Sequence, residues 1–336
     1  MNLLKKYKHW EREVYRRKAW NIGFLDYAGE KTLREPFKIA WLDWRGYDKG
    51  WFADPFILSA DGNRVEVLVE EMMLDKPPEK IFQIGRRREV VRRRGRISRL
   101  EIERENGKYV LRRVVPVIED KYHYSFPAIY RVDGKIFIHP ENGESGVSPL
   151  FEYDAATGTA TRAGTLCDAP IVDAVIFEGF GGEPLLFATR VDKPEKNECE
   201  NVLDVYRSKT GAFLGPYETE PFAEIAFPDF SARGGGYFLR LDGGRVVRVA
   251  QDCNRKYGAG IVFYEMKRED GKFSFRELAR HFADVSSIWH VGLHTFNTFG
   301  NLAVVDGYGY LHPLKRALYR VKERVGRLLH PERRGA

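Results

Sequence analysis

Short apolar runs alternate with polar residues through most of this chain. Five clear examples lie at residues 65–69, 136–139, 185–189, 237–241 and 302–305. Asp-Gly pairs, which favour tight β-turns, stand beside these runs. The pairs are Asp61-Gly62, Asp133-Gly134, Asp242-Gly243 and Asp306-Gly307. The pattern predicts a protein built almost entirely from short antiparallel strands.

The predicted strands fall into five similar units. Each unit opens on an apolar strand that carries polar side chains, passes through a turn to a second apolar strand, and ends in a more polar one. The units start near Phe52, Ser125, Asp173, Ala232 and His294, at spacings of roughly 50–70 residues, the scale of propeller blades with insertions. An all-β, five-bladed propeller over residues 20–311 explains the polar first strands, because innermost strands line a shared channel. A pair of β-sandwiches, the rival architecture, does not explain them.

Both ends of the chain read as basic amphipathic helices. In residues 2–20 and 313–329 apolar side chains recur near helical spacing, with lysine and arginine between them. The pattern therefore predicts a helix in residues 1–19 and another in residues 312–336. Either helix could pack on the body of the fold or lie on an anionic membrane surface.

The charge of the chain is concentrated in a few places. The net charge is +7, and apart from the ends the excess lies in Arg86-Arg87-Arg88, Arg92-Arg93-Arg94 and Arg96. This arginine cluster fits a solvated hairpin or a contact with an anionic glycan or lipid head group. No nucleic-acid-binding motif accompanies it, so we predict no nucleic-acid partner.

Cysteine usage and hydropathy restrict the compartment. The three cysteines, Cys167, Cys199 and Cys253, form neither a disulfide framework nor a CxxC metal pattern, which favours a reducing environment. No apolar run approaches the roughly 18 residues of a membrane span. We therefore expect a cytoplasmic protein, soluble or peripheral at the inner membrane.

The segment from Trp51 to Leu58 carries the first candidate for chemistry. Asp54 and Pro55 interrupt a run of aromatic and aliphatic residues. A carboxylate among apolar neighbours is costly unless it faces a polar cavity, and proline belongs at a strand start, edge or bulge. The segment predicts an acid displayed at the inner end of a short strand.

Further polar residues fall at comparable places in the later units. Hydrolysis of a glycosidic bond needs two carboxyl groups, one that donates a proton and one that acts as base or nucleophile. Asp54, Glu141 and Asp173 are the predicted catalytic carboxyl groups. The predicted substrate-binding residues are His123, Tyr124, Arg190, Arg233, Asp252, His290 and His294.

Other chemistries find less support. Of the histidines that could approach one another (His123, His139, His290 and His294), only the last two have short ligand spacing, so we predict no metal and no cofactor. A GxSxG nucleophile elbow is absent from the sequence. Gly234-Gly235-Gly236 lacks the lysine of a phosphate loop, and we expect it to form a tight turn.

Several short motifs, taken together, indicate a family resemblance. They are Trp20-Asn21-Ile22-Gly23, Phe52-Ala53-Asp54-Pro55-Phe56, His123-Tyr124-Ser125-Phe126-Pro127, Ile138-His139-Pro140-Glu141-Asn142, Gln251-Asp252-Cys253 with Tyr257-Gly258, and Gly292-Leu293-His294-Thr295 with Asp306-Gly307. In these motifs the chain resembles the domain family named after the N-terminal region of plant glucosamine inositolphosphorylceramide transferase.

The resemblance implies a five-bladed propeller similar to the arabinanase/fructosidase-like glycosidases. In those enzymes a first-blade aspartate is base or nucleophile and a third-blade aspartate tunes it, which implies these roles for Asp54 and Asp173. Where the glycosidases carry a Glu-Gly-Pro acid, this chain reads Ser231-Ala232-Arg233-Gly234-Gly235. Glu141, from another blade, is then the candidate acid.

The sequence therefore predicts a carbohydrate-active propeller. It would act by glycosidic bond hydrolysis or transglycosylation on an anionic bacterial surface polysaccharide or its lipid-linked precursor. The predicted partners are an oligosaccharide or lipid-linked sugar and an anionic membrane surface. The alternative is a non-catalytic glycan-binding or scaffold module of polysaccharide biosynthesis. A glycosyltransferase using an activated sugar is a weaker third interpretation, because no nucleotide-binding motif supports it.

Overall fold

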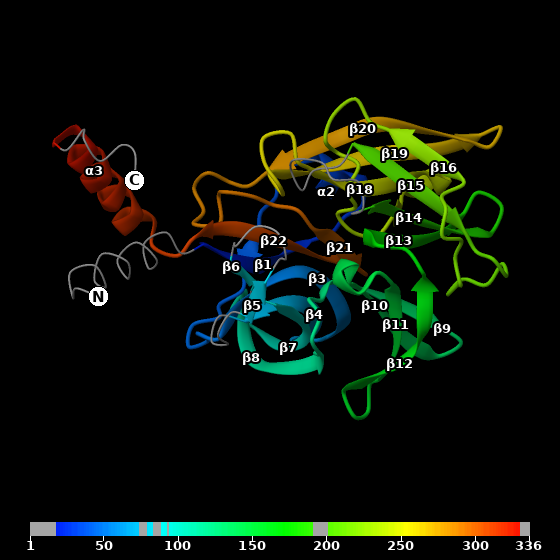
Figure 1. The fold of residues 1–336 in the computed structure, drawn as a ribbon, viewed down its shortest axis with the longest axis horizontal. Helices are drawn as coiled ribbons and strands as arrows, with labels where there is room; N and C mark the ends of the chain where they lie inside the picture. The colour runs from blue at the N-terminus through cyan, green and yellow to red at the C-terminus, as the bar shows by residue number, and fades with distance from the viewer. Residues whose placement is uncertain (1–17, 74–78, 83–88, 93, 191–200, 330–336) are drawn as a thin grey trace.

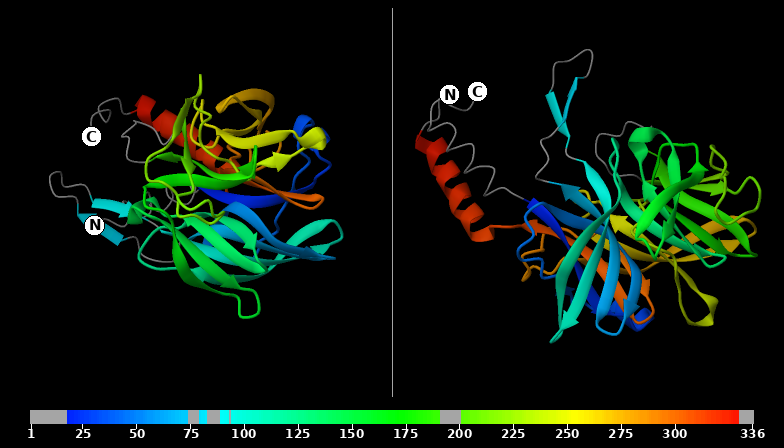
Figure 2. Two further views of the ribbon diagram at one scale, coloured as in Figure 1. Left: turned by 90° about the vertical axis from the view of Figure 1, so that its right-hand side faces the viewer. Right: turned by 90° about the horizontal axis from the view of Figure 1, so that it is seen from below.

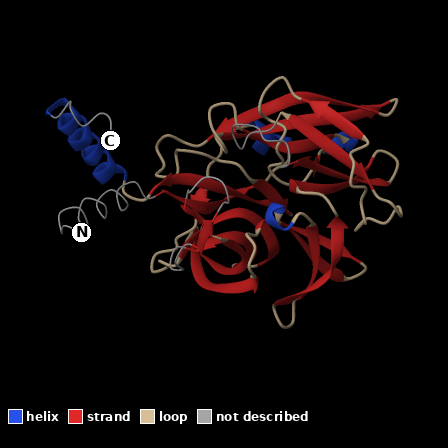
Figure 3. Cartoon of the chain, in the orientation of Figure 1, coloured by secondary structure: helices blue, strands red, loops and turns tan. Residues whose placement is uncertain are grey.

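Nearly all of the regular structure is β-sheet. The computed structural model describes residues 18–73, 79–82, 89–92, 94–190 and 201–329. These residues form five four-stranded antiparallel sheets and one two-stranded ribbon, and Figure 3 shows how few of them are helical. The sheets follow one another as blades around a centre (Figure 1). The predicted five-bladed β-propeller is confirmed.

The chain builds blades 1 to 4 from the innermost strand outward. Blade 1 contains β3 (Gly50–Asp61), β4 (Arg64–Met73), β7 (Gly95–Glu105) and β8 (Lys108–Ile118). Blade 2 contains β9 (Ser125–Val132), β10 (Lys135–Glu141), β11 (Ser148–Asp154) and β12 (Thr159–Cys167). Blade 3 contains β13 (Ile171–Gly179), β14 (Glu183–Arg190), β15 (Val202–Arg207) and β16 (Ala223–Ala226). Blade 4 contains β17 (Leu239–Arg240), β18 (Val246–Asp252), β19 (Gly260–Glu269) and β20 (Lys272–Phe282). Blade 5 contains β21 (Phe296–Phe299), β22 (Leu302–Tyr310), β1 (Lys18–Asp26) and β2 (Ala40–Trp41).

The ribbon and the helices lie outside this pattern. The ribbon pairs β5 (Glu79–Phe82) with β6 (Glu89–Arg92) between the second and third strands of blade 1. The helices are α2 (Glu30–Arg34) and α3 (Pro313–Leu329), and single 3₁₀ turns occur at Gly143–Ser145 and Asp242–Gly244. In the part of the chain that the structure describes, neither helix is long and apolar enough to cross a membrane. Most of the arginine cluster lies outside the described residues.

Blade 5 joins the two ends of the propeller. β1 pairs with β22 along its whole length, from Lys18 opposite Tyr310 to Asp26 opposite Leu302. Most of the predicted helix over residues 2–20 lies outside the described residues, but its last three residues were predicted wrongly, because they begin β1. Trp20 is buried there against the site described below. The ring is thus closed by pairing of distant strands and not by a local hairpin.

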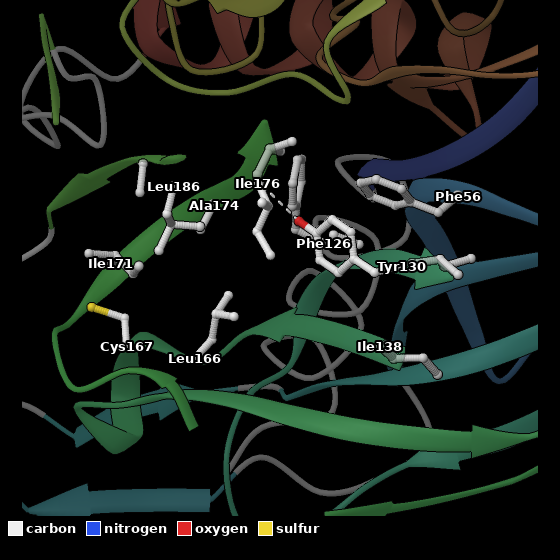
Figure 4. Packing of buried hydrophobic residues seen from close by; sticks show 14 of the residues in the cluster. Phe56, Phe126, Tyr130, Ile138, Leu166, Cys167, Ile171, Ala174, Ile176 and Leu186 are labelled. Atoms are coloured by element: carbon white, nitrogen blue, oxygen red, sulfur yellow. Dashed lines mark hydrogen bonds between the residues drawn. The ribbon is translucent and has the colours of Figure 1, made fainter. Parts of the chain in front are cut away.

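Apolar side chains fill the spaces between neighbouring blades. In the largest cluster Phe56 of blade 1 meets Phe126 edge-to-face, with ring centroids 4.9 Å apart. Tyr130 of blade 2 accepts a hydrogen bond of 3.0 Å from the backbone N–H of Ile176 in blade 3. Figure 4 shows these side chains converging from three blades. The core therefore fixes each inner strand against the next one.

Two sequence-based turn predictions were wrong, and both errors fall at the centre of the propeller. Asp306 and Gly307 lie within β22, where a side chain at position 307 would collide with the ring of Trp41. Gly234 and Gly236 belong to an irregular inner segment before β17. A Cβ on Gly234 would lie 2.6 Å from the carbonyl oxygen of Asp173, and one on Gly236 would strike the backbone of Phe296. These glycines allow close approach of chains and do not reverse the chain.

Closure of the ring by β1 can be tested with Phe24, which is fully buried between blades 5 and 1. We expect Phe24→Ala to lower the free energy of unfolding by about 3–5 kcal/mol, the usual cost of truncating a buried phenylalanine. Phe180→Ala is the matched control, because Phe180 is 37% exposed in a turn of blade 3. Equal losses in chemical denaturation would contradict a closing role for β1.

Candidate functional site

Three successive inner strands carry the same irregularity. Asp54, Phe126 and Asp173 each have a positive φ, at 49°, 43° and 50°. In each blade one extra residue is inserted at this point of the inner strand relative to its partner strand. Such β-bulges re-aim side chains and leave a backbone N–H without its ladder partner. Left-handed backbone at a residue other than glycine is costly and persists where surrounding contacts enforce it.

Acid side chains replace the missing strand partners. Each one accepts a hydrogen bond from the backbone N–H at the bulge of the following blade. The backbone N–H of Asp54 in blade 1 donates to Asp306 Oδ2 of blade 5 at 3.0 Å. The N–H of Phe126 in blade 2 donates to Asp54 Oδ2 at 3.3 Å, and that of Asp173 in blade 3 donates to Glu141 Oε2 at 3.1 Å. Three acids thus link four blades around the centre.

Glu70 and Glu141 occupy equivalent places in blades 1 and 2. Glu70 pairs with Ala53 and Glu141 with Ser125, one residue before the bulge in each case. Burial, together with the charges of Asp54 and Glu141, raises the pKa of Glu70 well above its usual range. Burial and then the charge of Asp173 raise the pKa of Glu141 to about 8. Glu141 therefore keeps a proton near neutral pH.

We call Asp54, Glu70, Glu141, Asp173 and Asp306 the central carboxylate cluster. Burial and the neighbouring acids raise the pKa of Asp54 to about 6, although the charge of His294 opposes that rise. Asp54 Oδ1 also accepts a hydrogen bond of 3.0 Å from the hydroxyl of Thr295. Near neutral pH the cluster consequently contains an ionised acid, Asp54, and a protonated one, Glu141.

His294 lies between two acids of this cluster. Its Nδ1 is 2.6 Å from Asp306 Oδ2, and its Nε2 is 3.7 Å from Asp54 Oδ1. Burial alone would lower the pKa of His294, but the two carboxylates outweigh burial and raise that pKa to about 8. The ring stacks on Trp20 at 4.0 Å and meets Tyr257 edge-on at 5.6 Å. An imidazolium held in this way neutralises part of the charge of the acids.

Arg233 neutralises another acid of the cluster. Its Nε donates to Asp173 Oδ2 at 2.6 Å, and both side chains are buried. The guanidinium also lies over the ring of Tyr257, 5.0 Å from its centroid. Burial by itself would lower the pKa of Arg233, but the charge of Asp173 raises it overall. Arg233 therefore holds Asp173 in a fixed, hydrogen-bonded geometry.

The sequence-predicted residues separate into two groups. Asp54, Glu141, Asp173, Arg233 and His294 come together at the centre, as the contacts above describe. His123 lies at the rim of this group, because its Nε2 is 3.6 Å from Glu70 Oε1 while its Nδ1 accepts a hydrogen bond of 2.8 Å from the N–H of Gly95. His123, Glu141 and Tyr257 are only half-buried, so an incoming ligand would meet them first.

The remaining predicted binding residues have other partners in the structure. Tyr124 is 1% exposed within the apolar core, and its hydroxyl donates to Asp120 at 2.8 Å. Asp252 accepts a hydrogen bond of 2.6 Å from Arg280 within blade 4. Arg190 lies 3.3 Å from Glu220, and His290 Nδ1 lies 2.8 Å from the carbonyl oxygen of Ser287. These contacts stabilise the individual blades and loops in which the residues lie.

Three residues of the candidate site were not among the predicted catalytic or binding residues. Glu70 and Asp306 stand among the polar residues of the predicted units but received no role, and Asp306-Gly307 was also interpreted as a turn. Trp20 was placed in a helix. The alternation of the Leu302–Tyr310 segment continues beyond Asp306, a signal that could have identified a strand. Glu70 stands in the first unit where Glu141 stands in the second, a correspondence that alignment of the five units could have revealed.

One group of described residues has the spacing of a metal site. Possible ligand atoms of Asp54, His294 and Asp306 all lie within 4.8 Å of one another. In the present arrangement the 2.6 Å contact of His294 Nδ1 with Asp306 Oδ2 is a hydrogen-bond distance that requires a proton between the two atoms. His294 Nε2 is 3.7 Å from Asp54 Oδ1, too far for a hydrogen bond. The geometry therefore describes a hydrogen-bonded His294–Asp306 pair with the Asp54 carboxylate beside it.

Fold and site together define a class of protein: a five-bladed propeller whose inner strands assemble a buried, partly neutralised carboxylate cluster. Within that class the sequence comparison is decisive. The family model described as "Glucosamine inositolphosphorylceramide transferase 1, N-terminal" matches residues 82–288, more than half of the chain. The chain belongs to this family.

Individual relatives are more distant. The chain is 25% identical over 155 residues to glucosamine inositolphosphorylceramide transferase 1 of Oryza sativa subsp. japonica, covering 45% of this chain and 20% of that protein. The match to the same-named protein of Arabidopsis thaliana is 25% over 144 residues, covering 43% and 18%. The chain thus spans about a fifth of the length of these curated relatives. A solved thermostable family-43 glycoside hydrolase superposes with a TM-score of 0.48 at 11% identity, covering 76% of this chain and 88% of that one.

The proton held by Glu141 predicts a dependence of stability on pH. Between the ordinary glutamate pKa and about 8 the folded protein binds a proton that the unfolded chain releases, so the free energy of unfolding falls as pH rises through this window. Glu141→Gln removes that penalty. We expect the variant to be more stable than wild type by roughly 1–3 kcal/mol at about pH 9 and equal to it at about pH 4.

The measurement is chemical denaturation across this pH range. Glu152→Gln is the matched control, because Glu152 on the neighbouring strand β11 is 39% exposed and pairs with Lys135. Its stability should follow the wild-type curve. A Glu141→Gln curve parallel to that of wild type would contradict a proton on Glu141.

Proposed function

We propose that this propeller is carbohydrate-active and acts on a glycosidic linkage by hydrolysis or transglycosylation. The observation that carries the proposal is the pairing of an acid with a pKa of about 6, Asp54, and an acid with a pKa of about 8, Glu141, in one cluster. Carboxyl groups whose environments separate their pKa values are typical of acid-base catalysis. Glycosidic bond cleavage requires this combination of a proton donor and a base or nucleophile.

Each residue has a role in this proposal. Glu141 gives its proton to the leaving oxygen, and its side chain is partly exposed. Asp54 acts as base or nucleophile, positioned by Thr295 and the bulge N–H of Phe126. Asp173, held by Arg233, orients the Glu141 carboxyl through its backbone N–H.

The proposed substrate is an anionic bacterial surface polysaccharide or its lipid-linked precursor. The names of the curated relatives couple a sugar, glucosamine, with a phosphate-bearing lipid, which supports a glycolipid or related sugar. Arg233 and His294 are both paired with carboxylates in the present structure. Their contribution to anion binding would therefore require an incoming group to share them with Asp173 or Asp306.

A non-catalytic glycan-binding module is the second candidate. The Arg233–Asp173 ion pair and the hydrogen bonds to both oxygens of Asp54 favour it, because these acids have a complete structural role without a reaction. The two candidates differ in what they require of Asp54. The enzyme needs its ionised carboxylate for turnover, whereas the binding module needs only a polar group of the same shape.

Asp54→Asn separates the two candidates. The amide oxygen can still accept the N–H of Phe126, so the fold should be retained, whereas the base or nucleophile is lost. We expect turnover of acidic oligosaccharides or lipid-linked sugars to fall by about 10²–10⁴-fold, with affinity unchanged within a few-fold. Asp61→Asn, the same change at the exposed end of the same strand, should have no effect. Turnover by Asp54→Asn at the wild-type rate would refute catalysis by Asp54, and equal binding without turnover by either protein would favour the binding module.

The same assay predicts a pH profile. Activity requires Asp54 ionised and Glu141 protonated, so the rate should rise as pH passes about 6 and fall as it passes about 8. Glu141→Gln should retain little activity at any pH. A wild-type rate that stays constant from about pH 5 to about pH 9 would contradict both assignments.

A further inference from the structure

The C-terminal helix α3 carries a continuous apolar stripe that faces solvent. Leu314, Leu318, Val321 and Val325 are 81%, 71%, 59% and 47% exposed. At about 100° per residue these four positions fall within an arc of roughly 60°. Figures 1 and 2 show α3 extending away from the blades. Leaving such a stripe in water is unfavourable, and exposed apolar patches of this kind mark interaction sites.

Positive charge borders the stripe on both sides. Lys315 and Lys322 fall on one flank and Arg324 falls on the other at helical spacing. The helix contains six lysine or arginine residues and one acidic residue. An apolar face with basic flanks is the pattern of helices that lie in the interface of an anionic bilayer, with the apolar side chains among the acyl chains and the cations among the head groups.

We propose that α3 docks the propeller on a membrane surface rich in anionic phospholipid. The helix is 17 residues long, so it would lie along the surface for about 25 Å. Lysine and arginine side chains would reach the head groups while their stems cover the border of the stripe. This inference does not depend on the proposed function, because it concerns residues outside the central carboxylate cluster.

A second copy of the chain is the competing occupant of the stripe. The spacing of four, three and four residues also fits a coiled-coil seam, in which the flanking positions select the partner through opposite charges. Here the flanking residues are Lys315, Lys322 and Arg324, with the neutral Ala317. Two such helices would bring like charges together, whereas an anionic surface would neutralise them. Charge complementarity therefore favours the membrane.

Docking through α3 would also keep the candidate site near the membrane. β22 carries Asp306 of the central carboxylate cluster and ends at Tyr310, and α3 begins at Pro313. The guanidinium of Arg316 lies over the Tyr310 ring, 3.2 Å from its centroid. Seven residues separate Asp306 from Pro313 and span at most about 23 Å of extended chain, so the start of the helix is tethered within that distance of the cluster.

The test is flotation of the full chain with lipid vesicles. Wild type is compared with the double variant Leu314→Gln, Leu318→Gln, which keeps the net charge and uses a good helix former. Phe180→Gln is the matched control, because Phe180 is an exposed apolar residue in the turn at the opposite end of blade 3 from Asp173. Vesicles are phosphatidylcholine alone or with about 30% phosphatidylglycerol.

We expect wild type and Phe180→Gln to float with the anionic vesicles, and the double variant to show an apparent partition coefficient at least about tenfold lower. Binding of wild type should weaken at high salt and be lost on phosphatidylcholine alone. An unchanged melting temperature would show that the double variant retains the folded propeller. Equal flotation of wild type and the double variant, or no flotation of wild type, would overturn the proposal. The proposal would also be overturned if wild type formed a dimer and bound no vesicles, and the double variant were a monomer.

Discussion

The interaction on which the propeller centre depends is a carboxylate that accepts the backbone N–H of a bulge in the next blade. A bulge leaves that N–H without a strand partner, and an unpaired buried donor costs about 1–3 kcal/mol. Asp306, Asp54 and Glu141 remove this cost in three consecutive places. The hydrogen bond that ionised Asp54 accepts is stronger than one to a neutral acceptor, and all three bonds help to hold the left-handed residues at the bulges in place. Acid side chains are thus part of the framework, and any chemistry they perform is added to that structural role.

This arrangement carries an electrostatic cost that the protein only partly offsets. Burial raises the pKa values of Asp54, Glu70 and Glu141. Arg233 pairs with Asp173, and His294 lies beside Asp306 and Asp54. Glu141 instead holds a proton near neutral pH. Functional sites commonly keep such local instability, which the rest of the fold supports. The apolar packing between blades supplies that support here.

Much of the architecture could be predicted from the sequence because each blade is a local unit. The starts at Phe52, Ser125 and Asp173 lie in β3, β9 and β13, and those at Ala232 and His294 lie just before β17 and β21. The five-membered repeat and the inward display of Asp54 and Asp173 followed from alternation and turn residues. Chain closure could not be predicted in this way, because the β1–β22 pairing joins strands from opposite ends of the described chain and the amphipathic start of β1 resembled a helix.

The positions of individual site residues could not be predicted for a similar physical reason. Arg190, Asp252 and His290 are polar residues near strand ends, and from the sequence they cannot be distinguished from residues that line the centre. The structure gives them partners inside their own blades or loops. Asp306 was grouped with the polar residues of the fifth unit, yet Asp306-Gly307 also predicted a turn, because an Asp-Gly pair usually signals one. In β22 that glycine instead makes room for Trp41.

The pairing of β1 with β22 has a consequence for how the protein is made. Lys18 and Tyr310 are neighbours in the sheet, yet nearly the whole chain is synthesised between them. At about 5–20 residues per second, β1 waits on the order of 15–60 seconds on the ribosome before its partner exists. During that time its apolar residues lack their partners, and Asp54 lacks the Asp306 oxygen that fixes its backbone. Assembly of the centre therefore cannot finish before β22 has been synthesised.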